Sequence, residues 1–322
     1  MSTPMSTPAS TVHVVTGAGP VGSTVAQQLA DAGHRVRLLT RSGSGPVHPL
    51  IERRRVDVSR PEALAEAFTG AVAVHHCIHG SAYDSRVWRA ELPGAERAVL
   101  EAAGRVGAVV VFPESLYSYG PVDGTIRETT PRTATTGKLG VRTELLAQRD
   151  ASSTATVSVA ASDFYGPAVR TAHAGERLVP TVLAGRTMRL LGSADQPHSF
   201  TYVPDLAAAM ITAAATPELW NSFLHAPTAP AVTQRRLVEM VAEAGGVPVP
   251  KVSSIPVGAM RAVGLVSRGM RELAETGYMF DRPFVMSSTA SEERLGLSPT
   301  PLAEGLATTV AWWRAAQEPA AA

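Results

Sequence analysis

A turn with three glycines, Gly17-x-Gly19-x-x-Gly22, limits most strongly what this chain can fold into. It follows a β-branched run at 12–15 and precedes an apolar helical pattern that ends near Gly33. That context matters, because three glycines at this spacing are a weak signal when they stand alone. Between a strand and a helix, the first glycine permits a tight turn, the second lets a phosphate approach the backbone, and the third allows close helix–strand packing. The pattern therefore predicts a nucleotide-binding βαβ unit.

Strand and helix patterns continue to alternate through the first half of the chain. Strands separated by helical segments of this length predict right-handed crossovers and a mainly parallel sheet. We therefore expect an α/β fold of the Rossmann type, with a doubly wound parallel sheet whose ligand lies at the carboxyl ends of the strands. The further strands are expected at 36–39, 55–58, 72–75 and 109–112, with helices from residue 61 and over 95–103.

The regular alternation ends near residue 165, where segments spaced by Pro and Gly begin. We expect residues 11–165 to form the Rossmann domain and residues 166–322 to form mainly a smaller C-terminal substrate-binding lobe. Residues at about 198–215 are expected to return to the Rossmann domain. Residues 1–10 repeat Met-Ser-Thr-Pro without an apolar pattern, which predicts a disordered leader.

Composition narrows the class of partner. The chain has 322 residues with 45% hydrophobic content, enough for one α/β core and a lobe, and its net charge of +1 argues against nucleic acid or an anionic membrane. Cys77 is the only cysteine, so no internal disulfide can form. The longest apolar stretches, such as 108–112, are far shorter than the ~18 residues of a membrane-spanning helix. We expect a cytoplasmic protein with a small-molecule substrate. A homodimer is one of the assemblies consistent with the sequence.

The residues after the second predicted strand favour NADP(H) as the bound nucleotide. Proteins that bind NAD(H) usually place an Asp or Glu on the ribose 2′-hydroxyl about twenty residues after the turn. Here that place holds Thr40, Arg41 and Ser42, and Arg41 can donate two hydrogen bonds to a 2′-phosphate. The alternative is that Arg41 is a solvated loop cation. Asp57 either contacts the adenine amino group or caps the next helix. These residues join a predicted cofactor set that also contains Gly17, Gly19, Pro20, Val21 and Gly22.

Four further motifs follow in order: Ser-Leu-Tyr-Ser-Tyr-Gly at 115–120, Glu-x-x-Pro at 128–131, Asp-Phe-Tyr-Gly-Pro at 163–167, and Phe-Thr-Tyr-Val-x-Asp at 200–205. With the glycine turn, their order and spacing make the chain resemble the short-chain dehydrogenase/reductases over nearly its whole length. The resemblance is to the extended and atypical members known as NAD-dependent epimerase/dehydratase-like proteins. The glycine turn is one residue shorter than the extended pattern, which points to the atypical branch.

The resemblance implies a catalytic group that this chain only partly carries. Ser115 falls where the family has a hydroxyl that orients the substrate oxygen. The family's Tyr-x-x-x-Lys pair is absent, and Lys138 and Arg142 occupy its two positions. An alignment shifted by two residues would place Thr136 and Gly140 there, which offer fewer groups that can act in catalysis. Repulsion between the two cations would make Lys138 a candidate proton donor. Two alternatives remain for Lys138: an electrostatic clamp on the ribose or substrate, and a helix-surface lysine.

Other side chains on the loops that should face the cofactor are candidates for the same site. Tyr117 is a further catalytic candidate, although a core tyrosine is an equal alternative. The resemblance places His79 and Tyr83 at the substrate entrance, and Tyr165 in the turn that shapes the substrate cleft. The histidine-rich segment 75–79 lacks the partners that a metal site needs, so no metal is expected.

Three functions are consistent with these residues. The first is an NADP(H)-dependent oxidoreductase that acts on a carbonyl or alcohol of a small metabolite, with Ser115 and Lys138 on its oxygen. The second is an epimerase or dehydratase of the nucleotide-sugar type that keeps its cofactor bound. The third is a non-catalytic dinucleotide sensor, in which binding biases a partner interaction.

Overall fold

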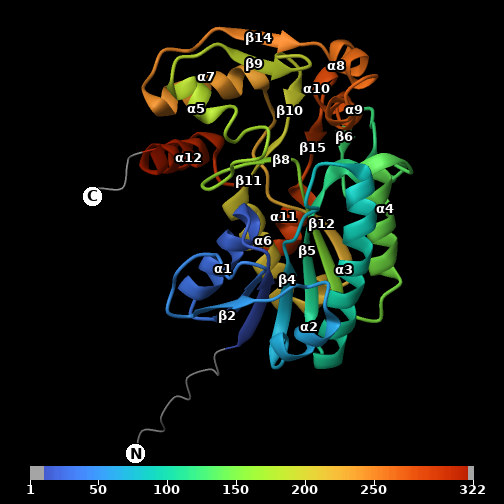
Figure 1. Ribbon diagram of the computed structural model, residues 1–322. Helices are drawn as coiled ribbons and strands as arrows, with labels where there is room; N and C mark the ends of the chain where they lie inside the picture. Colours follow the sequence, from blue (N-terminus) through green and yellow to red (C-terminus); the bar gives the residue numbers. More distant parts are fainter. Residues whose placement is uncertain (1–10, 318–322) are drawn as a thin grey trace, which may run out of the picture.

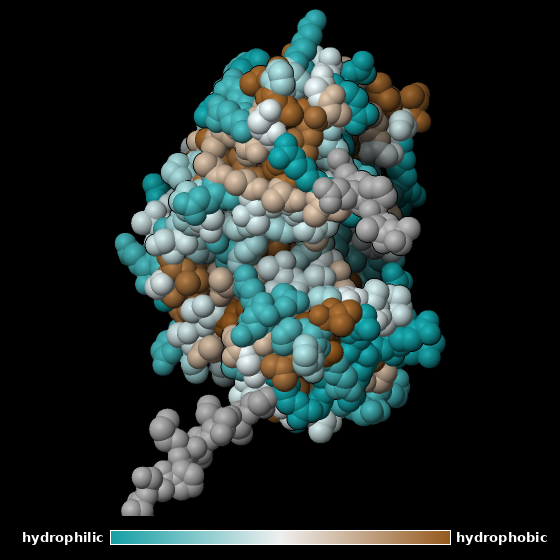
Figure 2. Space-filling model, turned by 90° about the vertical axis from the view of Figure 1, so that its left-hand side faces the viewer, coloured by the Kyte–Doolittle hydropathy of each residue, from teal (hydrophilic) through white to brown (hydrophobic). Residues whose placement is uncertain are grey.

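The structure is a computed structural model that describes residues 11–317, so the leader predicted at 1–10 lies outside the described residues. A layered sheet-and-helix part occupies the lower half of Figure 1, and a second part lies above it. Figure 2 shows the face that carries the first and last helices, where the surface is indented at the level at which the two parts meet. Within 11–317, no helix combines the length and apolar character that crossing a membrane requires.

A sheet of seven parallel strands confirms the predicted fold class. The strands lie side by side in the order β12-β7-β5-β4-β1-β2-β3. The chain therefore runs outward from β1 in one direction and then returns to continue from β4 in the other, which makes the β1–β4 boundary the point where ligands bind in such sheets. The bounds are β1 (Val12–Thr16), β2 (Arg35–Thr40), β3 (Ile51–Arg55), β4 (Ala71–His76), β5 (Val109–Ser115), β7 (Thr156–Ala161) and β12 (Ser222–His225).

Helices cover both faces of this sheet because the strands are apolar on both sides. Alternate strand residues divide between two cores: Val15 packs with α1 and α6, and Val14 packs with α2 and α3. Figure 1 shows α1 and α6 on one side of the sheet and α2, α3 and α4 on the other. Their bounds are α1 (Pro20–Asp31), α2 (Pro61–Ala67), α3 (Ser85–Val106), α4 (Gly137–Asp150) and α6 (Val203–Ala215).

Two elements begin earlier than the sequence predicts. α3 starts about ten residues before the predicted helix at 95–103, because the Asp84 carboxylate accepts a hydrogen bond from the Arg86 N–H (2.8 Å) and caps the first turn. The third strand begins at Ile51, four residues before the strand that was expected at 55–58. The longer α3 brings its first turn to the carboxyl edge of the sheet, next to the candidate site.

The second part is built from segments after β7, together with Thr125–Ile126, which pairs with Val285–Met286, and it has its own apolar core between α5, α7 and α12. The chain also returns from it to the Rossmann layer: β11 pairs with β8, α6 packs on α1, and β12 joins the sheet. The return thus extends to residue 225, beyond the predicted 198–215, and residues 289–295 pack against α6 and β12 as well. The bounds are β6 (Thr125–Ile126), β8 (Asp163–Tyr165), α5 (Val179–Leu183), β9 (Met188–Leu191), β10 (Pro197–His198), β11 (Phe200–Tyr202), β13 (Val232–Thr233), α7 (Gln234–Gly245), β14 (Val252–Ile255), α8 (Val257–Gly264), α9 (Arg268–Glu275), α10 (Tyr278–Asp281), β15 (Val285–Met286), α11 (Thr289–Leu295) and α12 (Leu302–Gln317).

Buried imidazoles in the sheet make its stability depend on pH. Burial, with the nearby imidazole of His13 adding to it, lowers the pKa of His75 to about 3. The unfolded chain takes up a proton on this ring below pH 6.5, whereas the folded chain does so only near pH 3. The free energy of unfolding therefore falls as the pH drops through this window, and the loss from this one residue is about 2 kcal/mol at pH 5.

We expect His75→Leu to remove that share of the acid sensitivity. Denaturant titrations at pH 7 and pH 5 measure the free energy of unfolding of both chains. The variant should lose about 2 kcal/mol less between the two pH values than the unmutated chain. An identical loss in both chains would contradict the assignment.

Candidate active site

The glycine turn lies at the carboxyl end of β1 and is shaped to accept a phosphate. Gly17 has a φ of +89° and donates its N–H to the Leu39 carbonyl (2.9 Å). A Cβ on Gly22 would lie 2.1 Å from the Gly17 carbonyl oxygen, so only glycine allows α1 to pack this closely. A Cβ on Gly19 would meet no atom within 4 Å. The open space at Gly19 faces the start of α1, and a dinucleotide pyrophosphate fits a helix N-terminus of this kind.

The end of β2 lies beside the glycine turn, where the Leu39 carbonyl accepts the Gly17 N–H. Arg41 is exposed, so its guanidinium is accessible to a ligand. The Ser42 hydroxyl lies 2.7 Å from the Ser44 hydroxyl, and Thr40 donates its hydroxyl to the Ser44 carbonyl (3.2 Å). The structure thus brings the three predicted residues 40–42 to one loop beside the glycine turn.

Asp57 lies near the same loop and is held by Ser59. Its carboxylate accepts hydrogen bonds from the Ser59 hydroxyl (2.7 Å) and N–H (3.0 Å). These bonds lower its pKa, and the charges of Arg60 and Arg41 add to the effect. Asp57 therefore closes a local turn ahead of α2 and places one carboxylate within range of Arg41.

Aromatic side chains gather beyond the ends of β4 and β5. The Trp88 ring lies edge-on to His79, with 4.5 Å between ring centroids, and stacks on Tyr117 at 6.2 Å. The Tyr117 and Tyr83 hydroxyls are 2.9 Å apart. Tyr117 is half-buried, whereas His79 and Tyr83 are exposed. Three of the predicted site residues therefore form one group around Trp88, which the sequence analysis did not include.

Both phenols in this group keep their protons. Burial raises the pKa of Tyr117 well above its usual value, and the Tyr83 phenol and the Asp163 carboxylate add to the rise. Desolvation of the Tyr83 hydroxyl, which contacts Tyr117 and Thr276, also raises its pKa, against the hydrogen bonds with these two residues and the charge of Lys138, which lower it. The Lys138 ammonium lies 4.5 Å from the centre of the Tyr83 ring, but two carboxylates already pair with it. It therefore does not act as the free cation that a reactive phenolate requires. They are suited to donating hydrogen bonds.

Ser115 ends β5 and is held by a buried charge network. Its N–H donates to Glu114 Oε1 (2.8 Å), and its hydroxyl lies 3.3 Å from the same oxygen. Arg142 donates its Nε–H to this oxygen (2.5 Å), and Arg149 bridges Glu114 Oε2 (2.8 Å) and Glu96 (2.6 Å). Arg142 is therefore a paired, buried cation. Glu114 was not predicted as part of the site, although a carboxylate at the end of an apolar run in a strand signals a buried partner.

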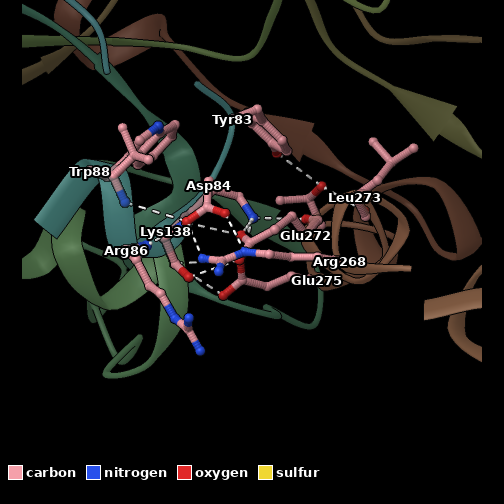
Figure 3. Close-up of polar contacts among 12 residues, drawn as sticks. Tyr83, Asp84, Arg86, Trp88, Lys138, Arg268, Glu272, Leu273 and Glu275 are labelled. Atoms are coloured by element: carbon pink, nitrogen blue, oxygen red, sulfur yellow. Dashed lines mark hydrogen bonds and ion pairs between the residues drawn. The ribbon is translucent and has the colours of Figure 1, made fainter. Parts of the chain in front are cut away.

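Lys138 has none of the three roles predicted for it. Its side chain is fully buried, and Nζ donates to the Glu272 carbonyl and carboxylate (both 2.7 Å) and to the Glu275 carboxylate (2.6 Å). Figure 3 shows these contacts, with the Tyr83 ring close by. Because two carboxylates from α9 neutralise the ammonium, it is neither a proton donor, nor a free clamp, nor a surface lysine.

The same contact joins the two parts of the molecule. The Ser85 hydroxyl at the start of α3 donates to Glu272 (2.9 Å), and Arg268 forms an ion pair with Asp84. Tyr83 reaches Thr276, the residue that follows α9, with its hydroxyl (3.2 Å). Lys138 thus belongs to a junction that fixes the first turns of α3 and α4 against α9.

Tyr165 is not in the cleft where it was predicted. It is 1% exposed, and its ring packs against Tyr202 with 5.2 Å between centroids. A Cβ on Gly305 would lie 2.5 Å from the Tyr165 hydroxyl, so the missing side chain of α12 makes room for the phenol. Tyr165 therefore packs in the core of the second part.

Comparison with known proteins agrees with this geometry. Residues 13–222 match the model of the NAD dependent epimerase/dehydratase family, and the chain belongs to this family. No curated protein sequence matches the chain.

Solved structures share the fold at low sequence identity. The UDP-glucuronic acid 4-epimerase from Bacillus cereus in complex with NAD superposes with a TM-score of 0.76 and 16% identity, over 95% of this chain and 100% of that chain. The UDP-glucose 4-epimerase from Thermotoga maritima with UDP-glucose has a TM-score of 0.75 and 19% identity over the same shares. The Thermus thermophilus UDP-glucose 4-epimerase complex with NAD has 0.73 and 22%, over 95% and 99%.

Proposed function

We propose that the chain is an NADP(H)-dependent oxidoreductase that acts on a carbonyl, or the matching alcohol, of a small metabolite. One observation carries the proposal. The open glycine turn lies at the carboxyl end of β1, and the Ser115 and Tyr117 hydroxyls lie at the carboxyl end of β5, with β4 between the two strands. A dinucleotide held by the turn would extend its reactive end toward those hydroxyls.

The protein's own part in such a reaction is binding and orientation. A bound nicotinamide supplies or accepts a hydride. Gly17, Gly19 and Gly22 would hold the pyrophosphate, and Arg41 the ribose phosphate. Ser115 and Tyr117 would hydrogen-bond the substrate oxygen, which stabilises the charge that develops there. The raised pKa of Tyr117 suits a hydrogen-bond donor that stays protonated.

An epimerase or dehydratase is the second candidate, favoured by the family match and by the names of the structural neighbours. The two reactions differ in net cofactor use. An oxidoreductase consumes NADPH when it is mixed with a panel of carbonyl compounds, and the absorbance of NADPH falls. An epimerase would instead copurify with a cofactor that shows no net turnover. Consumption of NADPH supports the first candidate, and a tightly bound cofactor without consumption supports the second.

We expect Arg41→Ala to remove most of a preference for NADPH over NADH. One charge-assisted contact to a 2′-phosphate contributes about 1.5–3 kcal/mol, which corresponds to roughly 10- to 150-fold in affinity. Titration calorimetry with NADP⁺ and NAD⁺ measures the ratio. Arg35→Ala, at the opposite end of β2, is the matched control and should leave the ratio unchanged. Equal affinities in the unmutated chain would contradict the assignment.

A further inference from the structure

Asp163 and His198 form a pair in the second part of the molecule, close to the candidate site. His198 Nε2 lies 2.9 Å from Asp163 Oδ2, and His198 Nδ1 lies 3.1 Å from the Met279 carbonyl oxygen. The imidazole is 2% exposed, whereas the Asp163 side chain keeps 19% of its surface open. The pair therefore has one buried member and one that reaches solvent.

The hydrogen bonds of this pair require one proton more than a neutral imidazole and a carboxylate carry. A backbone carbonyl accepts only, so Nδ1 must carry a hydrogen toward Met279. An ionised carboxylate also accepts only, and a neutral imidazole has a single N–H. Either His198 is doubly protonated beside an ionised Asp163, or Asp163 is protonated and donates to Nε2. In both states the pair is neutral overall and holds one transferable proton.

The surroundings of the pair favour this neutral state. The His198 ring lies between Phe200, Phe280 and Phe284, with centroid distances of 4.8, 5.2 and 5.3 Å. A lone carboxylate beside an imidazole lone pair would be costly next to this apolar wall. Burial raises the pKa of Asp163, but the hydrogen bond and charge of His198 outweigh it and lower the pKa overall.

Asp163, the half-buried member of the pair, closely follows the strand that pairs with β5, which ends at Ser115. Ser115 is the register partner of Ala161, the last residue of β7, and Asp163 begins β8 two residues later in the chain. The Asp163 charge contributes to the raised pKa of both Tyr83 and Tyr117. His173, whose pKa the charges of Asp163 and His198 shift in opposite directions, is a further titratable neighbour of the pair within residues 11–317. Asp163 therefore lies near the sheet edge that carries Ser115 and within electrostatic range of both phenols.

We propose that Asp163 and His198 share one proton and deliver it to the substrate oxygen, in the role that the resemblance assigns to a tyrosine expected at position 138. The catalytic half of this inference rests on the proposed function. When the proton leaves, an N–H or O–H bond of the pair breaks and an O–H bond forms on the oxygen of a carbonyl that gains a hydride from the bound nicotinamide. The pair is then left with one negative charge and regains its proton from water. The Tyr83 and Tyr117 phenols, which hold their own protons firmly, orient that oxygen.

Nitrogen-15 NMR of the full chain tests the shared proton without any substrate. His225 is an internal control, because its Nδ1 faces the Ser287 carbonyl (2.7 Å) and its Nε2 faces the Tyr119 hydroxyl (2.9 Å), which can donate. At pH 7, we expect His225 to carry one N–H. We expect His198 to carry two, or one together with a protonated Asp163 seen in the carbon-13 spectrum.

Asp163→Asn is the matched variant, since its amide can donate to Nε2 and preserve the contact without the extra proton. His198 should then carry a single N–H, NADP⁺ affinity should stay unchanged, and NADPH-dependent turnover of a carbonyl compound from the panel should fall about 100-fold or more. One N–H on His198 beside an ionised Asp163 in the unmutated chain would overturn the shared proton. Unchanged turnover in Asp163→Asn would overturn its delivery. Failure to bind NADP⁺ in a chain whose pair still holds the proton would instead overturn the proposed function.

Discussion

Gly19→Val is expected to abolish dinucleotide binding while the chain stays folded. A Cβ at this position meets no protein atom within 4 Å, and the residue has an ordinary φ of −69°, so valine fits the folded chain. The space that the valine would fill is the space that a pyrophosphate needs at the start of α1. Titration calorimetry with NADP⁺ should show an affinity at least about 100-fold weaker, which is a loss of at least ~2.7 kcal/mol. Thermal unfolding should show little change in Tm.

Gly94→Val is the matched control for this variant. Gly94 lies on the exposed side of α3, where a Cβ also meets no atom within 4 Å. The control should bind NADP⁺ as the unmutated chain does. Unaltered binding by Gly19→Val would show that the dinucleotide site lies elsewhere.

Lys138→Met is expected to destabilise the chain without weakening dinucleotide binding. The variant leaves the Glu272 and Glu275 carboxylates without their shared cation in a largely buried junction. Breaking a buried pair by removing one partner costs about 3–5 kcal/mol, and we expect about 3 because both carboxylates keep some solvent contact. Denaturant titration measures the free energy of unfolding, and calorimetry below the unfolding transition measures NADP⁺ affinity.

The chain offers a close control, because Lys251 is its only other lysine and is exposed. Lys251→Met should change the free energy of unfolding by less than about 0.5 kcal/mol. A stable Lys138→Met protein that has lost affinity for NADP⁺ would support the clamp role instead of the junction.

The glycine turn and the Rossmann layer could be predicted because their signals are local. The roles of Gly17 and Gly22 follow from backbone geometry within a few residues, and the strand and helix patterns repeat over short windows. The start of α3 was misplaced because Asp84, its cap, lies before a segment whose apolar pattern becomes regular only later. Such boundaries depend on single capping contacts.

The roles of the side chains in the site depend on partners far along the chain. The carboxylates that bind Lys138 lie more than 130 residues away in α9, and no short-range pattern links them to it. Tyr165 packs in the core because Gly305 of α12 leaves space for its phenol. Asp163 lies close to His198 because β8 pairs with β11. The sequence predicted Lys138 and Tyr165 in the site and gave no role to His198, and only the tertiary contacts show where each of these side chains is paired or packed.

Titration of the purified, unmutated chain with NADP⁺ and NAD⁺ tests the central claim most directly. The account predicts one binding site for each chain, with NADP⁺ bound at least about tenfold more tightly than NAD⁺. Saturation of the site by NADP⁺ should also be lost in Gly19→Val. Absence of binding by both dinucleotides, in a chain that is folded and free of copurified cofactor, would contradict the account.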